Sequence, residues 1–379
     1  MSTDPAISAF LAERIEANDF PSAAYLVAEK GEIVLLDALG NAVVDPDVIS
    51  ARVDTIYDLA SMTKVLVTGL LMAMEVEKGS VAVDDAVAKY LPEFDVRGKR
   101  SITVKQLLSH TSGLPGWRPF YLLTPDPAGI LAEIGRLPAG ENEKPVTYSD
   151  PNFIALGKIV ERLRREPLNE AFSSSVATPL GLKDSGFGPV DKAKLNRTAA
   201  SEKGNEFERN TCIEQGYLDP KNPPATAGGS PFREDVIWGD VHDGNAYFMG
   251  GVAGHAGLFS TAEEVFKIAQ QFLPQCTQLL MPETCELFTT NFTPGLNEHR
   301  SFAFQLASTP ESTAGPSMSP QSFGHLGFTG TSLWIDPVKD RIFILLTNRT
   351  HHHPLPFVLL NSVRRHFHEL ANAFLDQKK

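Results

Sequence analysis

Runs of strand-forming, mostly apolar residues lie near both ends of this 379-residue chain. They are residues 23–28, 32–38, 301–307, 330–335 and 341–347. The first two runs flank the short turn Glu29-Lys30-Gly31, and the last two flank residues 336–340, so each pair is predicted to form a hairpin. Strands at both ends, with helical patterns between them, indicate a sheet that is built from both ends of the chain around a helical insertion.

Helical patterns fill most of the middle of the chain and stand at each end of it. The predicted helices are residues 6–17, 61–78, 102–109, 152–165, 260–272 and 359–374. Thr3 or Asp4 is expected to cap the first helix, Gly79 to end the second, and a Ser260-x-x-Glu263 capping box to open the fifth. Residues 81–94 and the stretch up to about 223 are predicted to be loops and short helices, and residues 219–229 a Pro- and Gly-rich loop.

The composition limits the partners of this chain more than it limits the fold. Hydrophobic residues make up 42% and charged residues 21%, as in an ordinary globular protein with a sizeable core. A net charge of -12 without any basic block argues against nucleic acid or an anionic membrane as a partner. Three scattered cysteines are expected to be reduced structural thiols, and no signal pattern is present, so a cytoplasmic location is expected.

The strongest chemical signal is Ser61-Met62-Thr63-Lys64, at the start of a predicted helix. One helical turn separates Ser61 from Lys64, so both side chains emerge on one face and can share a proton. A serine hydroxyl needs a neighbouring base before it becomes a good nucleophile, and a partly desolvated lysine amine can be that base. S-x-x-K at a helix start is an acyl-transfer signature of serine hydrolases, although about one such tetrapeptide is expected by chance in a chain of this length.

A second candidate group, Tyr148-Ser149-Asp150-Pro151-Asn152, stands just before another predicted helix. A lysine ammonium close to Tyr148 favours the phenolate form of its hydroxyl. Tyr148 is then able to take the Ser61 proton during acylation and to activate water during deacylation. The alternative is a core tyrosine beside a helix cap at Ser149 or Asp150.

A third candidate group, residues 325–331, is predicted to open a late strand. Its glycines allow a substrate to lie against the strand edge. The backbone N–H of Phe328, just after Gly327, is expected to form an oxyanion hole with the N–H of Ser61. His325 is placed to donate a hydrogen bond to the substrate or to Tyr148, unless it is an ordinary histidine at a strand end.

These three groups, S-M-T-K, Y-S-D and H-x-G in this order, resemble the class C β-lactamase and family VIII carboxylesterase group, which also contains DD-peptidases and is related to penicillin-binding proteins. The resemblance covers most of the chain. Flanking segments that share it are residues 57–60, 107–114, 178–182 and 346–349. It implies an α+β fold with an antiparallel β-sheet flanked by helices and an inserted all-helical domain. Residues 1–75 and 225–379 are then expected to form the sheet domain, residues 76–224 the helical domain, and the active site to lie between them.

The same resemblance implies roles for the candidate residues. Ser61 is expected to be the nucleophile, with Lys64 and Tyr148 as the base system. His325 stands where β-lactamases have a lysine. Gly327, Phe328 and Asp150 are expected to contribute to substrate binding and the oxyanion hole. No metal ion or cofactor is expected.

Three departures from the family pattern change what the site is expected to bind. Asp150 replaces the asparagine that often follows the tyrosine by two residues, so an amide donor is lost and a carboxylate is gained. Leu326 replaces the usual threonine, and His325 replaces a lysine. Because a neutral imidazole offers one donor where an ammonium offers three and a full charge, the site is predicted to bind a substrate carboxylate poorly.

Two further segments remain open to two interpretations each. Residues 241–257, rich in glycine and histidine, resemble a stretch found in esterase-like and DD-peptidase-like members of the group. In one interpretation, His242, Asp243 or Asn245 lines the cleft. In the other, the glycines allow tight backbone packing and the polar residues only form hydrogen bonds to that backbone. Residues 351–353, three consecutive histidines, are expected to be a solvated loop, with metal binding as the alternative.

The leading hypothesis is a serine hydrolase with an acyl-Ser61 intermediate, a carboxylesterase acting on small acyl esters. The alternative is a β-lactamase or an amidohydrolase of the D-Ala-D-Ala carboxypeptidase or D-aminopeptidase kind. A non-catalytic binding protein is disfavoured because Ser61, Lys64 and Tyr148 are all present. The expected partner is a small ester or amide, while the natural substrate and the oligomeric state are left open.

Overall fold

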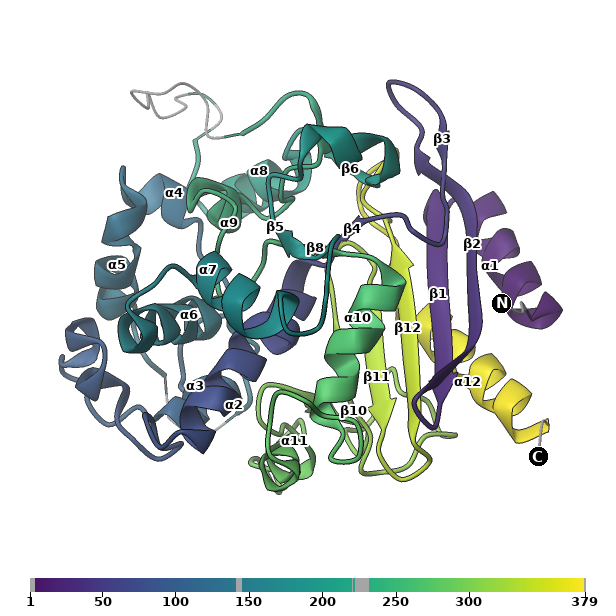
Figure 1. Cartoon of the computed structure of the whole chain (residues 1–379). Coiled ribbons are helices and arrows are strands. Elements are labelled where there is room, and N and C mark those ends of the chain that lie inside the picture. The colour runs from purple at the N-terminus through teal and green to yellow at the C-terminus, as the bar shows by residue number, and fades with distance from the viewer. Residues whose placement is uncertain (1–3, 141–144, 220, 222–231, 378–379) are drawn as a thin grey trace.

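The computed structural model describes residues 4–140, 145–219, 221 and 232–377. Its main sheet has seven strands in the order β3-β2-β1-β12-β11-β10-β9, and every neighbouring pair is antiparallel (Figure 1). These strands are β1 (Ser22–Glu29), β2 (Glu32–Val43), β3 (Ile49–Ser50), β9 (Gln305–Leu306), β10 (Phe323–Leu326), β11 (Ser332–Asp336) and β12 (Arg341–Thr347). β1 pairs along nearly its whole length with β12, so the two ends of the chain meet inside the sheet. The predicted α+β fold with an antiparallel sheet is confirmed.

Both predicted hairpins form, and local chemistry explains each turn. β1 and β2 are joined by Lys30 and Gly31, whose φ values of 54° and 78° are positive. Between β11 and β12, the Asp336 carboxylate accepts hydrogen bonds from the backbone N–H groups of Val338 and Lys339 at 3.1 and 3.0 Å. This side chain therefore closes the turn that brings the two strands together.

Two strand predictions near the carboxyl end are wrong. Residues 301–307 contain only the two-residue strand β9, because the Ser301 N–H bonds to the Phe304 carbonyl at 3.0 Å and Ala303, with a φ of 70°, reverses the chain. His325 does not open the strand predicted at 330–335, because it lies in a separate strand, β10, which pairs with β11. Four residues give a weak local signal, and the neighbouring strands on both sides stabilise them.

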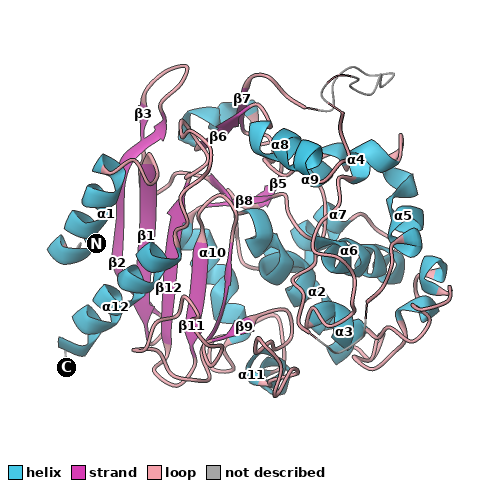
Figure 2. Cartoon of the chain, turned by 180° about the vertical axis from the view of Figure 1, so that it is seen from behind, coloured by secondary structure: helices cyan, strands magenta, loops and turns pink. Residues whose placement is uncertain are grey.

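Helices cover both faces of the main sheet. α1 (Pro5–Glu16) and α12 (Asn361–Gln377) lie on one face and α10 (Ala262–Ala269) on the other (Figure 2). Successive residues of β1 reach opposite cores, since Tyr25 packs in the cluster of α1 and α12 and Leu26 in the cluster of α10. The central strands are therefore buried on both faces.

Helix caps agree with the sequence at α1 and differ from it at α10. The Asp4 carboxylate accepts the N–H groups of Ala6 and Ile7, both at 2.9 Å, as predicted. At α10 the cap is Thr261, whose hydroxyl accepts the N–H of Glu264, so the predicted Ser260-x-x-Glu263 box is displaced by one residue. Ser260 is instead the last residue of the short strand β8 (Leu258–Ser260).

The helical part of the chain lies beside the sheet (Figure 1). The helix predicted at residues 61–78 is a 3-10 turn (Ala60–Met62), a π-helical turn (Lys64–Gly69) and α2 (Leu70–Glu77) in succession. The other helices are α3 (Val104–Leu108), α4 (Phe120–Leu123), α5 (Ile130–Arg136), α6 (Asp150–Arg164), α7 (Leu168–Phe172), α8 (Glu206–Glu214), α9 (Gly244–Phe248) and α11 (Glu286–Thr289). Short strands that the sequence analysis missed are β4 (Tyr57–Asp58), β5 (Gly186–Phe187), β6 (Ala200–Lys203), β7 (Val236–Trp238) and β8 (Leu258–Ser260).

One apolar core connects the α10 face of the sheet with α2 and α6. The predicted division into residues 1–75 with 225–379 and residues 76–224 stays an expectation. Its boundary at residue 224, and most of the predicted loop at 219–229, lie outside the described residues. Within the described ranges, no helix has both the length and the apolar character needed to cross a membrane.

Candidate active site

A strained turn presents Ser61. β4 ends at Asp58, whose carboxylate accepts the N–H of Ala60 at 2.8 Å. Ala60 has a φ of 47°, a left-handed conformation that costs a residue with a Cβ about 1–2 kcal/mol. The Thr63 hydroxyl bonds back to the Ala60 carbonyl at 2.7 Å and closes the turn. Strain of this kind is retained where the surroundings hold it, and here it places Ser61 at the start of a helix.

Lys64 is fully buried and its ammonium contacts three groups. Its Nζ lies 3.0 Å from Ser61 Oγ, 3.1 Å from the His255 carbonyl oxygen and 2.7 Å from Asp150 Oδ1. Burial lowers the pKa of this ammonium, but the charges of Asp150 and Tyr148 outweigh burial and raise the pKa above its usual value. Lys64 is therefore charged at neutral pH and donates a hydrogen bond to Ser61 Oγ, whereas the sequence analysis considered an uncharged amine that accepts a proton.

Tyr148 lies beside this ammonium, in the segment that leads into α6. Lys64 Nζ is 4.9 Å and the Arg300 guanidinium carbon 5.5 Å from the centroid of its ring. The tyrosine is only half-buried and lines the same two cavities as Ser61. Of the two interpretations of Tyr148, its position favours the tyrosine of an active site over one of the core.

The turn between β10 and β11 is bonded to the backbone that precedes Ser61. The Thr331 and Thr329 hydroxyls donate to the carbonyls of Leu59 and Asp58 at 3.2 and 2.7 Å. A Cβ on Gly327 would lie 2.5 Å from the Leu59 carbonyl oxygen, so only glycine permits this approach. Among the described residues, the N–H of Phe328 has no acceptor, as an oxyanion-hole donor requires.

His325 has the opposite hydrogen-bonding character from the one predicted. Its Nδ1 lies 2.8 Å from the Leu326 carbonyl oxygen, which can only accept, so the ring proton is on Nδ1. Burial and the charges of Arg300 and Lys64 hold the pKa of His325 well below its usual value, and the ring is neutral. Nε2 is buried, has no partner within the described part of the chain, and is an acceptor. The prediction that His325 donates to substrate or to Tyr148 is therefore wrong.

Three arginines that the sequence analysis missed line a cavity of about 350 Å³ together with Ser61, Tyr148 and His325. Arg300 forms an ion pair with Glu298 at 2.6 Å. Arg349 and Arg364 are more than nine-tenths buried, and neither pairs with a carboxylate among the described residues.

Arg349 and Arg364 are held by backbone carbonyls rather than by acids. Arg349 donates to the Phe328 carbonyl at 2.6 Å, and Arg364 to the Gly327 carbonyl at 2.8 Å. Burial lowers the pKa of Arg349 to about 10, and burial together with Arg349 lowers the pKa of Arg364 to about 9. Both guanidinium groups stay charged at neutral pH. The expectation of a site poorly suited to a carboxylate rested on His325 and Leu326 and left these cations out.

A second cavity, of about 290 Å³, is also lined by Ser61. Aromatic side chains and three carboxylates line much of it: Trp117, Tyr148, Phe207 and Phe328, with Asp150, Glu208 and Asp243. Burial and the charge of Asp243 raise the pKa of Glu208 to about 7.

Both interpretations of the segment at residues 241–257 are correct for different residues. His242 and Asp243 line the second cavity. Asn245 instead accepts the Phe120 N–H and donates to the Arg118 carbonyl, both at 2.8 Å, and so ties a neighbouring loop in place.

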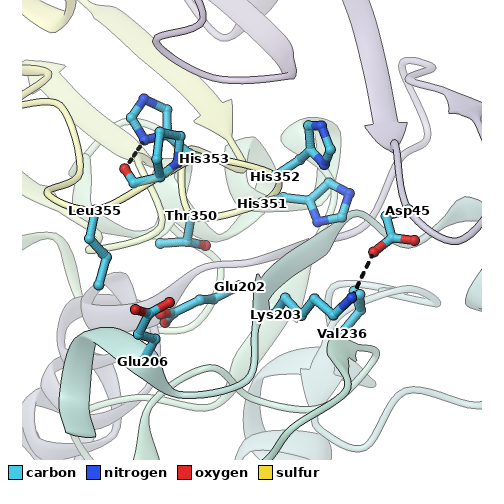
Figure 3. Close-up of a pocket in the computed structure, with 11 residues that line it drawn as sticks. Asp45, Glu202, Lys203, Glu206, Val236, Thr350, His351, His352, His353 and Leu355 are labelled. Atoms are coloured by element: carbon cyan, nitrogen blue, oxygen red, sulfur yellow. Dashed lines mark hydrogen bonds and ion pairs between the residues drawn. The ribbon is translucent and has the colours of Figure 1, made fainter. Parts of the chain in front are cut away.

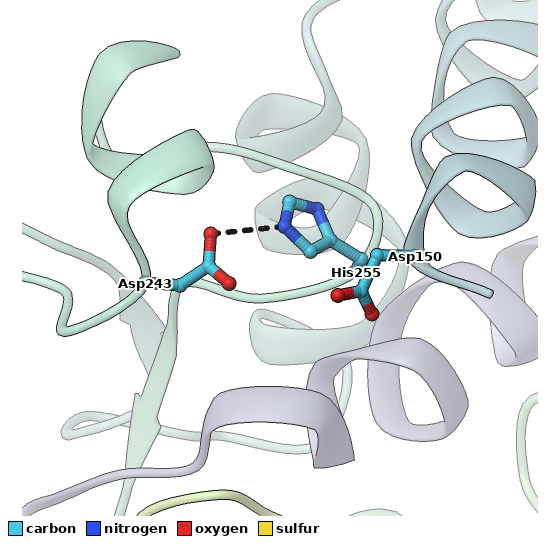
Figure 4. Close-up of side chains that lie close together, drawn as sticks. All are labelled: Asp150, Asp243 and His255. Carbon is cyan, nitrogen blue, oxygen red and sulfur yellow. Dashed lines mark hydrogen bonds and ion pairs between the residues drawn. The ribbon is translucent and has the colours of Figure 1, made fainter. Parts of the chain in front are cut away.

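Asp150, Asp243 and His255 form a group of possible metal ligands within the described part of the chain (Figure 4). His255 Nε2 lies 3.0 Å from Asp243 Oδ1. Asp150 is already paired with the Lys64 ammonium, which a cation would have to displace. Asp150 therefore holds Lys64, and because it also lines the second cavity, its predicted contribution to substrate binding stays a prediction.

The histidines at 351–353 lie elsewhere, in a cavity of about 360 Å³ with Asp45, Glu202 and Glu206 (Figure 3). The expected solvated loop is wrong for His351, which is buried. Its Nε2 accepts the Val44 N–H and its Nδ1 donates to the Ser201 carbonyl, both at 2.8 Å, so both ring nitrogens are used in structure. His352 is exposed.

A serine beside a buried ammonium and a tyrosine, on an α+β scaffold, defines a serine hydrolase with the β-lactamase and transpeptidase fold. Residues 7–361 match the model of the Beta-lactamase family, and the chain belongs to this family. Its members act on small ester, amide or peptide substrates.

Curated relatives and solved structures agree with this assignment. A protein of Escherichia coli K12 named "Putative D-alanyl-D-alanine carboxypeptidase" is 32% identical over 359 residues, 88% of this chain and 79% of the relative. A penicillin-binding protein homologue from Caulobacter crescentus is 22% identical, with a TM-score of 0.70 over 99% of both chains. EstCE1, described as a hydrolase with promiscuous acyltransferase activity, is 19% identical, with a TM-score of 0.71 over 96% of this chain and 97% of its own. The two structures support the fold alone.

Proposed function

We propose that this serine hydrolase removes the carboxyl-terminal residue from short peptides of the D-alanyl-D-alanine type through an acyl-Ser61 intermediate. The observation that carries the proposal is the pair Arg349 and Arg364, buried and charged without a carboxylate partner among the described residues, in a cavity that contains Ser61. A guanidinium group binds a carboxylate through two parallel hydrogen bonds, and a substrate carboxylate would supply the missing counter-ion. The name of the Escherichia coli relative supports the D-alanyl choice.

In the proposed reaction, Ser61 Oγ attacks the carbonyl carbon of the scissile amide and its proton passes to Tyr148, acting as a phenolate. The Lys64 ammonium donates to Ser61 Oγ and orients it. The N–H groups of Ser61 and Phe328 bind the carbonyl oxygen as it gains negative charge. When the C–N bond breaks, the leaving amino acid takes the proton from Tyr148.

Deacylation repeats these steps with water as the nucleophile. Water gives a proton to Tyr148 and attacks the acyl carbon, and the bond to Ser61 Oγ breaks as the serine takes that proton back. The acyl part of the substrate is proposed to occupy the second cavity, between Trp117 and Phe207. The arginines then hold only the leaving group, so the product amino acid can depart before water enters.

A carboxylesterase is the second candidate function. Apolar side chains also line the arginine cavity, namely Leu326, Phe328, Leu359 and Leu360, and they suit a small uncharged leaving group. This candidate predicts no preference for a carboxylate.

The cytoplasmic location expected from the sequence stays a prediction, which fractionation of the source cells tests.

The two candidates separate with three substrates. N-acetyl-D-alanyl-D-alanine, its carboxyl-terminal amide and p-nitrophenyl butyrate are incubated with the wild type and with Ser61→Ala. We expect the wild type to release D-alanine from the acid about 10- to 100-fold faster than it cleaves the amide, because a hydrogen bond to a charged group contributes about 1.5–3 kcal/mol. Ser61→Ala should lose all turnover. Equal turnover of acid and amide, or turnover of the ester alone, overturns the carboxypeptidase proposal in favour of the esterase.

A further inference from the structure

His110 lies behind Tyr148 and contacts the chain on both sides of it. Its backbone carbonyl accepts the N–H of Thr147 at 2.9 Å. Its side-chain Nδ1 accepts the N–H of Ser149, also at 2.9 Å. One fully buried residue therefore accepts the N–H groups of the two residues that flank the tyrosine.

The ring of His110 also supports the ring of Tyr148 directly. The two centroids are 4.5 Å apart, with 33° between the ring planes. On its other side, His110 contacts the ring of Phe153 in α6 at 5.2 Å. The tyrosine ring thus rests on a histidine that is itself packed against a helix.

The bond from Ser149 requires a neutral imidazole with its proton on Nε2. Burial and the charges of Arg300 and Lys64 hold the pKa of His110 well below its usual value. The acceptor at Nδ1 is therefore available throughout the neutral range.

Two further hydrogen bonds hold the segment that follows Tyr148. The Ser149 hydroxyl donates to the Pro115 carbonyl and the Asp150 N–H to the Gly116 carbonyl, both at 2.8 Å. Tyr148 belongs to neither a helix nor a strand, so these hydrogen bonds fix its position as regular structure fixes Ser61 and Lys64. Without the His110 bonds, the segment just before α6 keeps its attachment to residues 115–116 and loses it at the tyrosine.

We propose that His110 is a positioning residue, which holds Tyr148 at the reach of Ser61 by accepting the N–H of Ser149 and by supporting the tyrosine ring. The inference rests on the proposed function, because it needs Tyr148 to carry the proton of Ser61. His110 itself touches neither substrate nor the reacting atoms. It acts only through Tyr148, and this separates it from a histidine that merely stabilises the fold.

The test compares variants that keep or lose the acceptor at Nδ1. In His110→Asn the side-chain oxygen replaces Nδ1 as the acceptor, and asparagine tolerates the φ of 60° at this position. In His110→Gln the longer side chain no longer places an acceptor there. A displacement of about 1 Å at a reacting group costs about 100-fold in rate. We expect His110→Gln to lose about 10- to 100-fold in kcat at an unchanged KM for p-nitrophenyl butyrate, and His110→Asn to recover most of the loss.

A double-mutant cycle with Tyr148→Phe isolates the proposed role. A residue that acts through the tyrosine hydroxyl has no further effect on kcat once that hydroxyl is gone, so His110→Gln should be silent in Tyr148→Phe. His352→Gln is the matched control, since His352 also has a positive φ, of 50°, and is exposed. It should leave kcat unchanged.

Each outcome decides one claim. If Tyr148→Phe retains full kcat, Tyr148 is not the base, and the positioning role is overturned while the proposed substrate class is untouched. If Tyr148→Phe is impaired but His110→Gln is not, the positioning role alone is overturned. The positioning role is also overturned if the losses from His110→Gln and Tyr148→Phe multiply, or if His110→Asn is no better than His110→Gln at equal melting temperature.

Discussion

Replacing Asp150 with asparagine tests the charge balance that surrounds Ser61. The Lys64 ammonium is fully buried, and Asp150 Oδ1 lies 2.7 Å from its Nζ. The asparagine keeps an oxygen that can accept from the ammonium, and it removes only the negative charge. The substitution therefore leaves the shape of the site nearly intact while it takes away the main group that opposes the burial of Lys64.

The expected loss of stability follows from the exposure of the two side chains. Breaking a buried ion pair costs about 3–5 kcal/mol when one partner is left without any contact. Asp150 is 16% exposed at its side chain, and the amide oxygen keeps a neutral hydrogen bond, so we expect about 1.5–3 kcal/mol, the range for a hydrogen bond to a charged group. For 379 residues, the unfolding entropy is about 0.8 kcal/mol per degree, so the melting temperature should fall by about 2–4 °C.

The pH dependence of this loss has a definite sign. Because the pKa of Lys64 is raised in the folded protein, its pair with Asp150 stabilises the fold fully below the unfolded pKa of about 10.4. That stabilisation disappears as the pH rises through the folded pKa. In Asp150→Asn, burial lowers the pKa of Lys64 with less opposition, so the alkaline limb of kcat/KM should move to lower pH.

Thermal unfolding between about pH 7 and pH 11, and the pH profile of kcat/KM for p-nitrophenyl butyrate, measure both effects. Asp95→Asn is the matched control, because Asp95 pairs with Arg100 at the exposed surface and such pairs contribute about 0–1 kcal/mol. The reasoning would be refuted if the difference in melting temperature between the wild type and Asp150→Asn stayed constant up to about pH 11 and the alkaline limb of kcat/KM were the same in both proteins.

Three further substitutions test other parts of the site. Arg364→Met should reduce the preference for an acid over an amide substrate at least about tenfold, with ester turnover nearly unchanged, and an intact preference contradicts the arginine site. The stability of Glu208→Gln relative to the wild type should increase by up to about 3 kcal/mol when the pH is raised from 5 to 8. The reason is that the raised pKa of Glu208 makes its contribution to the stability of the wild type present at low pH and lost as the pH rises through about 7. Equal differences in melting temperature between the two proteins at both pH values count against this. Gly327→Ala should lower kcat by at least about 100-fold, since its Cβ would lie 2.5 Å from the Leu59 carbonyl, whereas Gly186→Ala, which meets nothing within 4 Å, should be active. An active Gly327→Ala would contradict the oxyanion turn.

Short-range spacing explains why Ser61 and Lys64 were the easiest residues to predict. Three residues apart at a helix start, they face each other whatever the rest of the chain does, and the structure places them 3.0 Å apart. Tyr148 and His325 followed from the order of motifs that the chain shares with a known group. The fold class followed from strands at both ends, although the two-residue and four-residue strands β9 and β10 depend on pairing partners that no local pattern shows.

Long-range contacts explain what the sequence analysis missed. Arg300, Arg349 and Arg364 are far apart in the chain, and only the arrangement of the loop before β9, the end of β12 and the start of α12 brings them to one cavity. His325 was expected to donate to the substrate, but its Nδ1–H already donates to the Leu326 carbonyl, which leaves Nε2 as an acceptor. A hydrogen-bond direction depends on which groups remain unpaired after folding, so it cannot be read from a motif.

By itself, the sequence determined the class of this protein, an α+β serine hydrolase, and the placement of Ser61 and Lys64 one helical turn apart. The tertiary structure decided the charges around that chemistry. Asp150 holds Lys64 as an ammonium, and among the described residues Arg349 and Arg364 are buried without a carboxylate partner. The physical reason is that reacting groups are set by local spacing, whereas protonation and substrate charge depend on burial and on side chains that meet only in the folded chain.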